Sequence, residues 1–255
     1  MRLEKDDTFF IGADVSKGQW VIIKLSKGGS WDVGLSPTIN EIWDNCCAAR
    51  LVLIDIPIGL HEDGAAERQC DMEARRLLGW PRRSSVFRVP CRAALKASSY
   101  GEARRINKSR TGKSLAIQSW GIITKIREVD EFLNDNIIAR SKIREIHPEV
   151  CFWALNGRKA ADIGKKTPEG ISERREILRR VYNQTDAILT FARHKFHGKV
   201  NDDDILDALV GAVTALLGEQ QIVTLPEKPE IDSRGLPMEM VYYLIPSPAP
   251  FLSQL

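Results

Sequence analysis

The sequence contains no long apolar run, and this absence excludes an integral membrane protein of the helical kind. The longest purely apolar runs are a few residues, such as residues 21–23, whereas a membrane-spanning helix needs about 20. Residues 1–7 are charged and include no apolar segment of the signal-peptide type. We therefore expect a cytoplasmic protein with no membrane partner.

The sequence also contains no CxxC pair, no P-loop and no GxGxxG motif. Its five cysteines are an odd number, and Cys46 and Cys47 are adjacent, which is a poor geometry for bridging to each other. We interpret the cysteines as reduced, mostly buried thiols rather than a disulfide framework. No internal repeat or low-complexity tract is present.

Charge is distributed very unevenly along the 255 residues, although the net charge is only +3. Residues 68–113 carry 13 basic and three acidic residues, whereas residues 1–67 have a net charge of −5 and residues 201–255 one of −7. Acidic ends and a basic middle indicate two functional surfaces of opposite sign.

The hydrophobic pattern predicts an α/β protein. Residues 8–25 read as a hairpin of two strands, residues 31–35 as a third strand, and residues 51–56 as a buried fourth strand. Between the third and fourth strands, Ser36 and Pro37 are expected to begin a helix that continues to about Arg50. This order favours three antiparallel strands joined through a helix to a parallel fourth strand.

The remaining segments are mainly helical, with one further strand. We expect helices at residues 65–78, 115–133, 167–190 and 204–217, a strand at 142–147, and a basic, turn-rich segment at 82–113. A domain of residues 1–220 would then contain a helical insertion at about 63–139. Residues 221–255 would form a C-terminal tail that packs on this domain.

Acidic residues stand at unusual positions in these elements. Asp14 ends the first strand, Asp55 lies inside the apolar fourth strand, and Glu145 lies in the later strand. Asp204 and Asp207 are three residues apart and share one face of a helix. If the first and fourth strands are neighbours, Asp14 and Asp55 lie side by side.

A cluster of carboxylates repels itself, and hard divalent cations relieve that repulsion. Oxygen ligands suit Mg²⁺ or Mn²⁺, and two such ions can activate a water molecule for phosphodiester cleavage. For single residues the alternatives stay open, because a strand-end Asp can cap a turn and Asp204 can serve as an N-terminal helix charge. Taken together, the pattern predicts a metal site.

Several ordered motifs resemble a known family. The matching stretches are Gly12–Ala13–Asp14, Asp55–Ile56–Pro57–Ile58–Gly59–Leu60, Arg68–Gln69–Cys70–Asp71, Ala74–Arg75, Ser85–Val86–Phe87 with Pro90, Glu145–Ile146–His147–Pro148–Glu149, Lys165–Lys166–Thr167 with Gly170, and Asp203–Asp204 through Asp207–Ala208. Over roughly residues 11–217 the chain resembles a bacterial and archaeal family of predicted RNase H-like nucleases, labelled domain of unknown function 429. The segment 204–209 is also similar to the last catalytic motif of Holliday-junction resolvases.

The resemblance implies an RNase H-like mixed sheet flanked by helices, with a helical insertion after the fourth strand. It implies a nuclease that hydrolyses phosphodiester bonds with two Mg²⁺ or Mn²⁺ ions. The candidate catalytic and metal-binding residues are Asp14, Asp55, Glu145, Asp204 and Asp207. The candidate orienting residues are His147, Glu149 and Lys166. For His147 a hydrogen-bonded structural role is an equal alternative.

The basic middle of the chain predicts a nucleic-acid partner, DNA or RNA. Arginine suits phosphate because its planar fork bonds two oxygens. The candidate nucleic-acid-binding residues are Arg68, Arg75, Arg82, Arg83, Arg88 and Arg92. Trp80, Phe87 and Tyr100 lie among these charges and either stack on bases or pack beneath a loop. The oligomeric state is not readable from the sequence.

Two rival functions remain. The first is a non-catalytic nucleic-acid-binding adaptor with an RNase H-like fold, in which the acids no longer support cleavage. The second is a small-molecule kinase of the actin-like class, whose first strand also carries an Asp before a small-residue turn. Such kinases duplicate the fold and are much longer, and no second glycine-rich phosphate hairpin occurs here.

Overall fold

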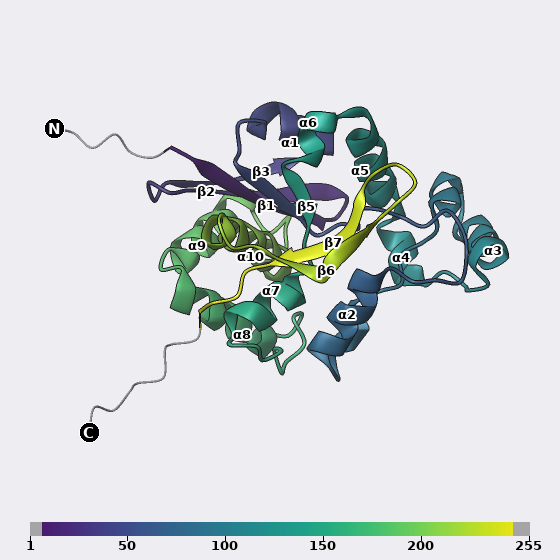
Figure 1. The fold of residues 1–255 in the computed structure, drawn as a ribbon. Helices are drawn as coiled ribbons and strands as arrows, with labels where there is room; N and C mark the ends of the chain where they lie inside the picture. The colour runs from purple at the N-terminus through teal and green to yellow at the C-terminus, as the bar shows by residue number, and fades with distance from the viewer. Residues whose placement is uncertain (1–6, 247–255) are drawn as a thin grey trace, which may run out of the picture.

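A five-stranded mixed sheet lies at the centre of the computed structural model, which describes residues 7–246 (Figure 1). The strands are β1 (Phe9–Ser16), β2 (Gln19–Ser26), β3 (Trp31–Ser36), β4 (Leu51–Ile54) and β5 (Ile143–Glu145). Their order in the sheet is β3-β2-β1-β4-β5. The first three are antiparallel to one another, and β4 and β5 run parallel to β1. The predicted antiparallel hairpin, third strand and parallel fourth strand are confirmed.

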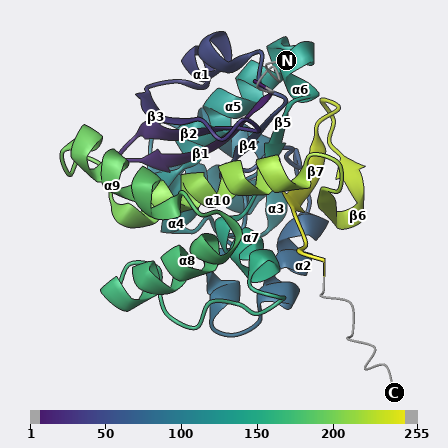
Figure 2. The same cartoon turned by 90° about the vertical axis from the view of Figure 1, so that its left-hand side faces the viewer.

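Side chains that alternate along the strands fill two cores, one on each face of the sheet. Phe10 and Leu53 belong to the core beneath α10 (Asp202–Gly218), which crosses one face of the sheet (Figure 2). Ile11 and Ile54 belong to the core on the other face. The helices that complete the α10 side are α7 (Pro148–Leu155), α8 (Pro168–Val181) and α9 (Thr185–Phe196). A mixed sheet covered on both faces by helices is consistent with the RNase H-like fold.

A long helical segment separates β4 from β5, as expected for an insertion after the fourth strand. Its elements are α2 (Gln69–Leu78), η1 (Arg82–Ser85), η2 (Arg92–Lys96), α3 (Tyr100–Thr111), α4 (Ile117–Gly121), α5 (Ile123–Asp135) and α6 (Ile137–Arg140). Together with α1 (Ile39–Cys46), α5 covers the face of the sheet opposite α10 (Figure 1). The segment of α2 and η1 instead extends below the sheet, beside α7.

A separate two-stranded sheet follows α10. Its strands are β6 (Val223–Ile231) and β7 (Pro237–Tyr242), and they pack against α2 and β5. An ion pair of 2.7 Å between Arg144 on β5 and Glu239 on β7 joins the hairpin to the main sheet. The last nine residues of the predicted tail, 247–255, lie outside the described residues.

Several predicted boundaries are wrong. Asp55 follows β4 rather than lying inside it. Thr38, not Ser36, caps α1 by accepting a hydrogen bond from the Glu41 N–H, and the helix ends at Cys46. Helix α2 begins at Gln69 instead of residue 65.

Two predicted helices are each divided in the structure, and three helices, α3, α6 and α7, were not predicted. The helix expected at 115–133 is interrupted at Ile122, which separates α4 from α5. The helix expected at 167–190 is broken after Val181, where α8 ends before α9 begins. The segment 82–113 contains α3 in addition to turns, and the strand at 142–147 is shortened because α7 begins at Pro148. Among residues 7–246, no helix is long and apolar enough to cross a membrane.

Candidate active site

Asp14 and Asp55 lie next to each other because of the register between β1 and β4. Ala13 pairs with Ile54 in this parallel ladder, and the Asp55 N–H donates to the Ala13 carbonyl over 3.0 Å. Both aspartates occupy the next position and share the phase of Gly12 and Leu53, so their side chains emerge on the α10 face. Within residues 7–246, neither carboxylate has a hydrogen-bond or ion-pair partner.

Helix α10 brings Asp207 to this pair through an unusually close approach to β1. A Cβ on Gly12 would lie 2.1 Å from both the Ala208 carbonyl oxygen and the Ala212 nitrogen, so only glycine allows the contact. Asp207 precedes Ala208 on the same turn and is fully buried. One of its oxygens, Oδ1, has no hydrogen-bond partner among residues 7–246. The helix therefore brings a third carboxylate close enough to interact with Asp14 and Asp55 at the ends of β1 and β4.

Asp204 begins the same face of α10, one turn before Asp207. Its Oδ2 accepts a 2.5 Å hydrogen bond from Ser16 Oγ at the end of β1 and a 3.2 Å bond from the Asn201 side-chain amide. The bond to Ser16 ties the first turn of α10 to the strand that carries Asp14. The sequence prediction that Asp14, Asp55, Asp204 and Asp207 gather at one place agrees with this arrangement.

A lysine that was not predicted lies among these acids. Lys165 Nζ forms an ion pair and hydrogen bond with Asp207 Oδ2. The loop that carries it is fixed at the start of α8, where Thr167 accepts from the Gly170 N–H over 3.1 Å. A Cβ on Gly170 would lie 2.0 Å from the Gly164 carbonyl oxygen, so the loop packs closely on the helix. The neighbouring Lys166, which was predicted as an orienting residue, is instead exposed.

Glu145 is held away from the other acids by a buried arginine. It pairs with Ile54 in the register of β4 and β5, one position before Asp55, so its side chain belongs to the opposite face of the sheet. Arg68 donates to both carboxylate oxygens over 2.8 Å, and the Ile58 N–H donates to Oε2 over 2.6 Å. Arg68 also bonds Asp71 over 2.6 Å. Both Glu145 oxygens are therefore already satisfied, and its predicted role as a metal ligand stays a prediction.

His147 and Glu149 follow β5 and lie at the start of α7. The His147 Nε2 is 3.4 Å from the Ser85 carbonyl oxygen, while Nδ1 is buried without a partner. Arg174 donates to Glu149 Oε1 over 2.6 Å, and Oε2 is buried without a partner. Each side chain thus keeps one polar atom that no described residue satisfies.

Burial and mutual repulsion shift the pKa values of the acids upward. Burial raises the pKa of Asp14 well above 3.8, and the adjacent Asp55 carboxylate adds to this effect. Burial likewise raises the pKa of Asp55 to about 8, although the Lys165 ammonium opposes the shift. The carboxylate of Asp207 in turn holds the pKa of Lys165 above its usual value. One lysine therefore does not offset the burial and mutual repulsion of these carboxylates, and without a further cation their ionisation is disfavoured.

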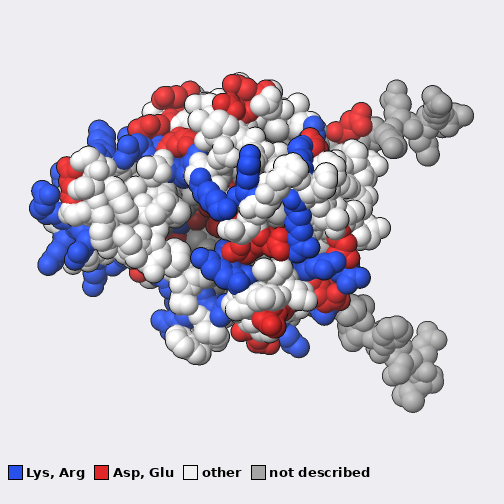
Figure 3. All heavy atoms as spheres, turned by 180° about the vertical axis from the view of Figure 1, so that it is seen from behind, with Lys and Arg blue, Asp and Glu red and all other residues white. Residues whose placement is uncertain are grey.

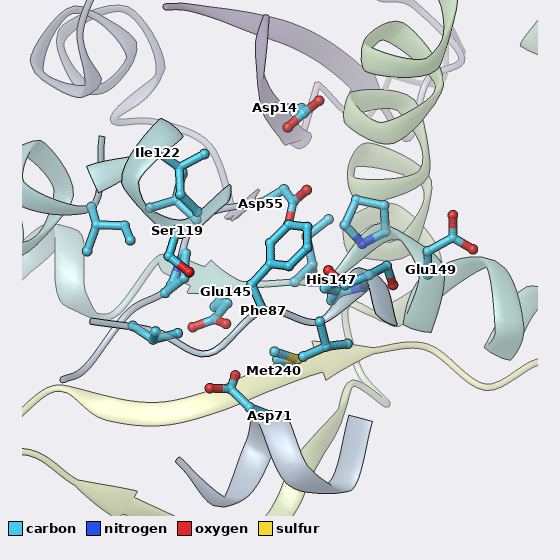
Figure 4. A pocket seen from close by; sticks show the side chains of 18 of the residues that line it. Asp14, Asp55, Asp71, Phe87, Ser119, Ile122, Glu145, His147, Glu149 and Met240 are labelled. Atoms are coloured by element: carbon cyan, nitrogen blue, oxygen red, sulfur yellow. The ribbon is translucent and has the colours of Figure 1, made fainter. Parts of the chain in front are cut away.

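A cavity of about 300 Å³ opens in front of the carboxylates (Figure 4). Asp14 and Asp55 lie on one side of it, and Glu145 and Asp71 lie on the other side in the same view. The wall between them is largely apolar. The apolar and aromatic lining residues are Val15, Ile56, Pro57, Val86, Phe87, Val89, Pro90, Ile122, Ile126, Ile146, Pro148 and Met240.

The predicted nucleic-acid-binding arginines divide into buried and accessible groups. Arg68 is only 2% exposed, and Arg92 is buried against Asp130 and Asp232. The predicted phosphate contacts of Arg68 and Arg92 are corrected accordingly, because carboxylates of the protein already neutralise both guanidinium groups. Arg75 is half-buried and pairs with Glu67.

Arg83 is exposed, and Arg82 and Arg88 are partly exposed. Arg82 and Arg88 line the cavity, and Arg83 is exposed between them on η1. In the space-filling view, a hollow containing acidic groups is bordered by basic side chains (Figure 3). A second basic group covers the end of the molecule formed by α3 (Figure 3).

The donor set suits a hard divalent cation in its chemistry. Asp14 and Asp55 offer carboxylate oxygens that no residue described in the structure satisfies, and the same holds for the buried Oδ1 of Asp207. As the side chains lie, no three His, Cys, Asp or Glu residues among positions 7–246 converge on a common metal position. Lys165 supplies the positive charge at Asp207 instead.

The signal for Lys165 in the sequence was its place in the motif Lys165–Lys166–Thr167, but periodicity could not tell which lysine turns inward.

Comparison with known proteins identifies a family and nothing more specific. No curated protein matches the chain, and no solved structure matches it. One family model, described as "Protein of unknown function (DUF429)", matches residues 12–231, which cover every residue of the site. The chain belongs to the DUF429 family.

Proposed function

We propose that this protein is a divalent-metal-dependent nuclease that hydrolyses phosphodiester bonds of nucleic acid. The observation that carries the proposal is the pair Asp14 and Asp55, which are adjacent in register, have no hydrogen-bond or ion-pair partner among the described residues, and lie close to the buried carboxylate of Asp207. Holding like charges together without a partner is unfavourable, and such arrangements occur where a ligand of opposite charge completes them.

Asp14, Asp55 and Asp207 would hold the metal once their side chains turn toward a common position and Lys165 releases Asp207, with Asp204 at the edge of the site. Bound Mg²⁺ or Mn²⁺ would supply an activated water and stabilise the leaving oxygen. The chain's own residues do the rest. Ser16 and Asn201 orient Asp204, and Lys165 restrains Asp207 and offers a cation to a phosphate.

The basic residues at the cavity support a phosphate-bearing substrate. Arg82 and Arg88 line the cavity that contains the acids, and Arg83 lies between them in the sequence. Phosphate contacts of this kind give affinity without reading sequence. They also bring a polyanion to a site that is itself acidic, which the acids alone would repel.

The test is cleavage of labelled DNA, RNA and hybrid substrates with Mg²⁺ or Mn²⁺. We expect Asp55→Asn to lower the rate by more than the roughly 100-fold that loss of an outer-shell partner costs at metal sites. Its fold should be intact, because the Asp55 contact to β1 is made by the backbone. Asp63→Asn, an exposed residue of the following loop, is the control. Equal cleavage by Asp55→Asn and the control would contradict the proposal.

A non-catalytic adaptor is the second candidate, favoured by the ion pair of Lys165 with Asp207. That ion pair already supplies a cation where the nuclease needs a metal. Calorimetric titration with Mg²⁺ and Mn²⁺ separates the two functions. The nuclease binds these ions and loses them in Asp14→Asn and Asp55→Asn, whereas the adaptor binds nucleic acid equally well in the presence of a chelator.

A further inference from the structure

The cavity in front of the carboxylates has a chemical character that phosphodiester hydrolysis alone does not need. A phosphate and its metal require charged and polar groups, yet much of the cavity wall is formed by aliphatic side chains and the ring of Phe87. Phe87 is 40% exposed although it is a large apolar residue. Exposing an apolar wall of this kind to water is unfavourable, and covering the wall with an apolar ligand lowers the free energy of the system.

Two buried polar atoms at the cavity are also without partners. Glu149 is 4% exposed and lines the cavity, and its Oε2 accepts no hydrogen bond among the described residues. His147 lines the cavity too, and its Nδ1 is similarly unsatisfied. Unpartnered buried groups are rare in native proteins because each costs free energy. A ligand with hydrogen-bonding groups along its edge would satisfy them.

A nucleobase combines these properties. It is flat and apolar on its faces, carries donors and acceptors on its edge, and is linked to a phosphate that Arg82 and the metal held by the acids would contact. A volume of about 300 Å³ is at the small end of ligand sites and suits a single nucleotide. Bases in a duplex are stacked on both faces, so only an unpaired or flipped base can enter such a cavity.

A second aromatic residue stands outside the cavity. Trp80 is 85% exposed and lies two residues before Arg82, with the exposed Arg83 beside it in the sequence. Tyr100, the third aromatic residue of this region, instead packs against Trp120 and bonds the Leu115 carbonyl. An exposed tryptophan next to arginines is typical of surfaces on which unpaired bases stack.

We infer that the cavity receives one unstacked nucleobase against Phe87, so that the protein acts on unpaired nucleotides rather than on continuous duplex. The inference rests on the proposed function, because it takes the phosphate of that nucleotide to lie at the carboxylates. The base comes either from a nucleic-acid strand or from a free nucleotide, and the chemistry recognised is the same.

Equilibrium binding tests the inference without any need for cleavage. Nucleoside monophosphates and ribose 5-phosphate are titrated against the full-length protein by calorimetry, with Ca²⁺ present. We expect the nucleotides to bind and ribose 5-phosphate, which has no base, to bind at least tenfold more weakly. Phe87→Ala should weaken nucleotide binding by about tenfold. Phe191→Ala, which changes a similarly exposed phenylalanine on α9 outside the cavity, should leave nucleotide binding unchanged.

A second arm uses an oligonucleotide as an intact single strand, as the same strand with one abasic position, and as a duplex. Tighter binding of the intact strand identifies nucleic acid as the source of the base, whereas binding of monophosphates alone identifies free nucleotides. Absence of binding by both, or equal binding of all three oligonucleotides with no effect of Phe87→Ala, overturns the inference.

The two proposals fail in different ways. If the protein cleaves nucleic acid but is indifferent to the abasic position and to Phe87→Ala, the cavity assignment is wrong and the nuclease stands. If bases bind but Asp55→Asn and the native protein both leave every substrate intact, the base-binding cavity stands without the nuclease.

Discussion

Asp14 and Asp55 show what a single position in a strand register decides. Each follows a paired residue of its strand, Ala13 or Ile54, and each therefore emerges at the same edge on the same face. Burial and the neighbouring negative charge then disfavour ionisation of both side chains. A folded-state pKa raised above 3.8 means that the protonated form of the carboxyl group favours the folded protein.

This shift predicts the direction of a pH effect on stability. The pKa of Asp55 is about 8 in the folded protein, so its favourable contribution is present at acidic pH and is lost as pH rises from about 4 to about 8. For the metal-free protein we expect the free energy of unfolding, relative to Asp55→Asn, to fall by about 4 kcal/mol between pH 5 and pH 8, because each unit of pKa shift corresponds to about 1.4 kcal/mol. Chemical denaturation in the presence of a chelator measures this difference.

Comparison with Asp55→Asn removes an opposing contribution from His147. Burial lowers the pKa of His147 to about 4, so the folded protein disfavours its protonation and loses stability as pH falls below 6.5. His147 is present in both proteins and its effect cancels. A parallel pH profile for the native protein and Asp55→Asn would contradict the assigned shift.

The placement of the aspartates in the fold was predicted more accurately from the sequence than that of the arginines. A carboxylate next to an apolar strand is costly, and that cost was visible from the neighbours of Asp55 in the chain. The burial of Arg68 depends on Glu145, which is 77 residues away, and that of Arg92 depends on Asp232, which is 140 residues away. No local pattern reports such partners, so these arginines were predicted as part of a phosphate-binding surface.

At the scale of elements, the contact between β1 and α10 sets the geometry of the site. Gly12 faces the backbone of α10 at Ala208 and Ala212, and the Cα of Gly12 lies 3.3 Å from where a Cβ on Gly211 would be. Two glycines therefore let a strand and a helix approach more closely than side chains permit. The approach places Asp207 over the strand end that carries Asp14.

A methyl group at Gly12 is therefore expected to separate the two elements. Gly12→Ala should lower the free energy of unfolding by about 3 kcal/mol, because the atoms it meets are backbone and cannot move aside. Urea denaturation measures this loss. Gly34→Ala in β3 is the matched control, since a Cβ there meets nothing within 4 Å. Similar stability of the two variants would mean that the close approach is not needed.

Helices were predicted correctly where the hydrophobic periodicity and the helical backbone are both continuous. The prediction failed where the helical backbone is interrupted but the hydrophobic periodicity continues. Ile122 interrupts the helical backbone between α4 and α5, yet Ile123 and Ile126 continue the buried stripe at helical spacing. Helix α3 was missed for the opposite reason, because two of its three buried residues are Asn107 and Thr111. The pattern of apolar side chains indicates which face of a helix is buried, but it does not indicate where the helix is interrupted.

At the scale of the whole molecule, the basic middle of the chain serves more than one purpose. Arg92 joins Glu62 and Asp130 of the insertion to Asp232 of the β6–β7 hairpin, so part of the positive charge holds the fold together. The rest faces outward in two places, at the cavity and over α3 (Figure 3). The sequence showed the excess of charge, and only the folded chain separates its inner and outer portions.

The two exposed basic surfaces, at the cavity and over α3, lead to a prediction about the salt dependence of nucleic-acid binding. If the strand passes over the cavity, changing Arg82, Arg83 and Arg88 together to Ala should reduce the slope of log K against log salt concentration for single-stranded nucleic acid by about 2, since each lost phosphate contact contributes roughly 0.7. Changing Arg104, Arg105 and Lys108 on α3 to Ala removes the same charge from exposed positions away from the cavity. Fluorescence titrations over a range of salt concentrations compare the two variants.

The comparison separates local contact from net charge. Both variants lower the charge of the protein by three, so a general attraction to a polyanion weakens equally in both. The slope changes only when fewer phosphates are contacted, because each contacted phosphate releases counterions. The variant that loses slope therefore identifies the surface that the strand covers. A larger loss of slope in the α3 variant would place the strand over α3, away from the carboxylates, and the acids could then not act on the strand that the arginines hold.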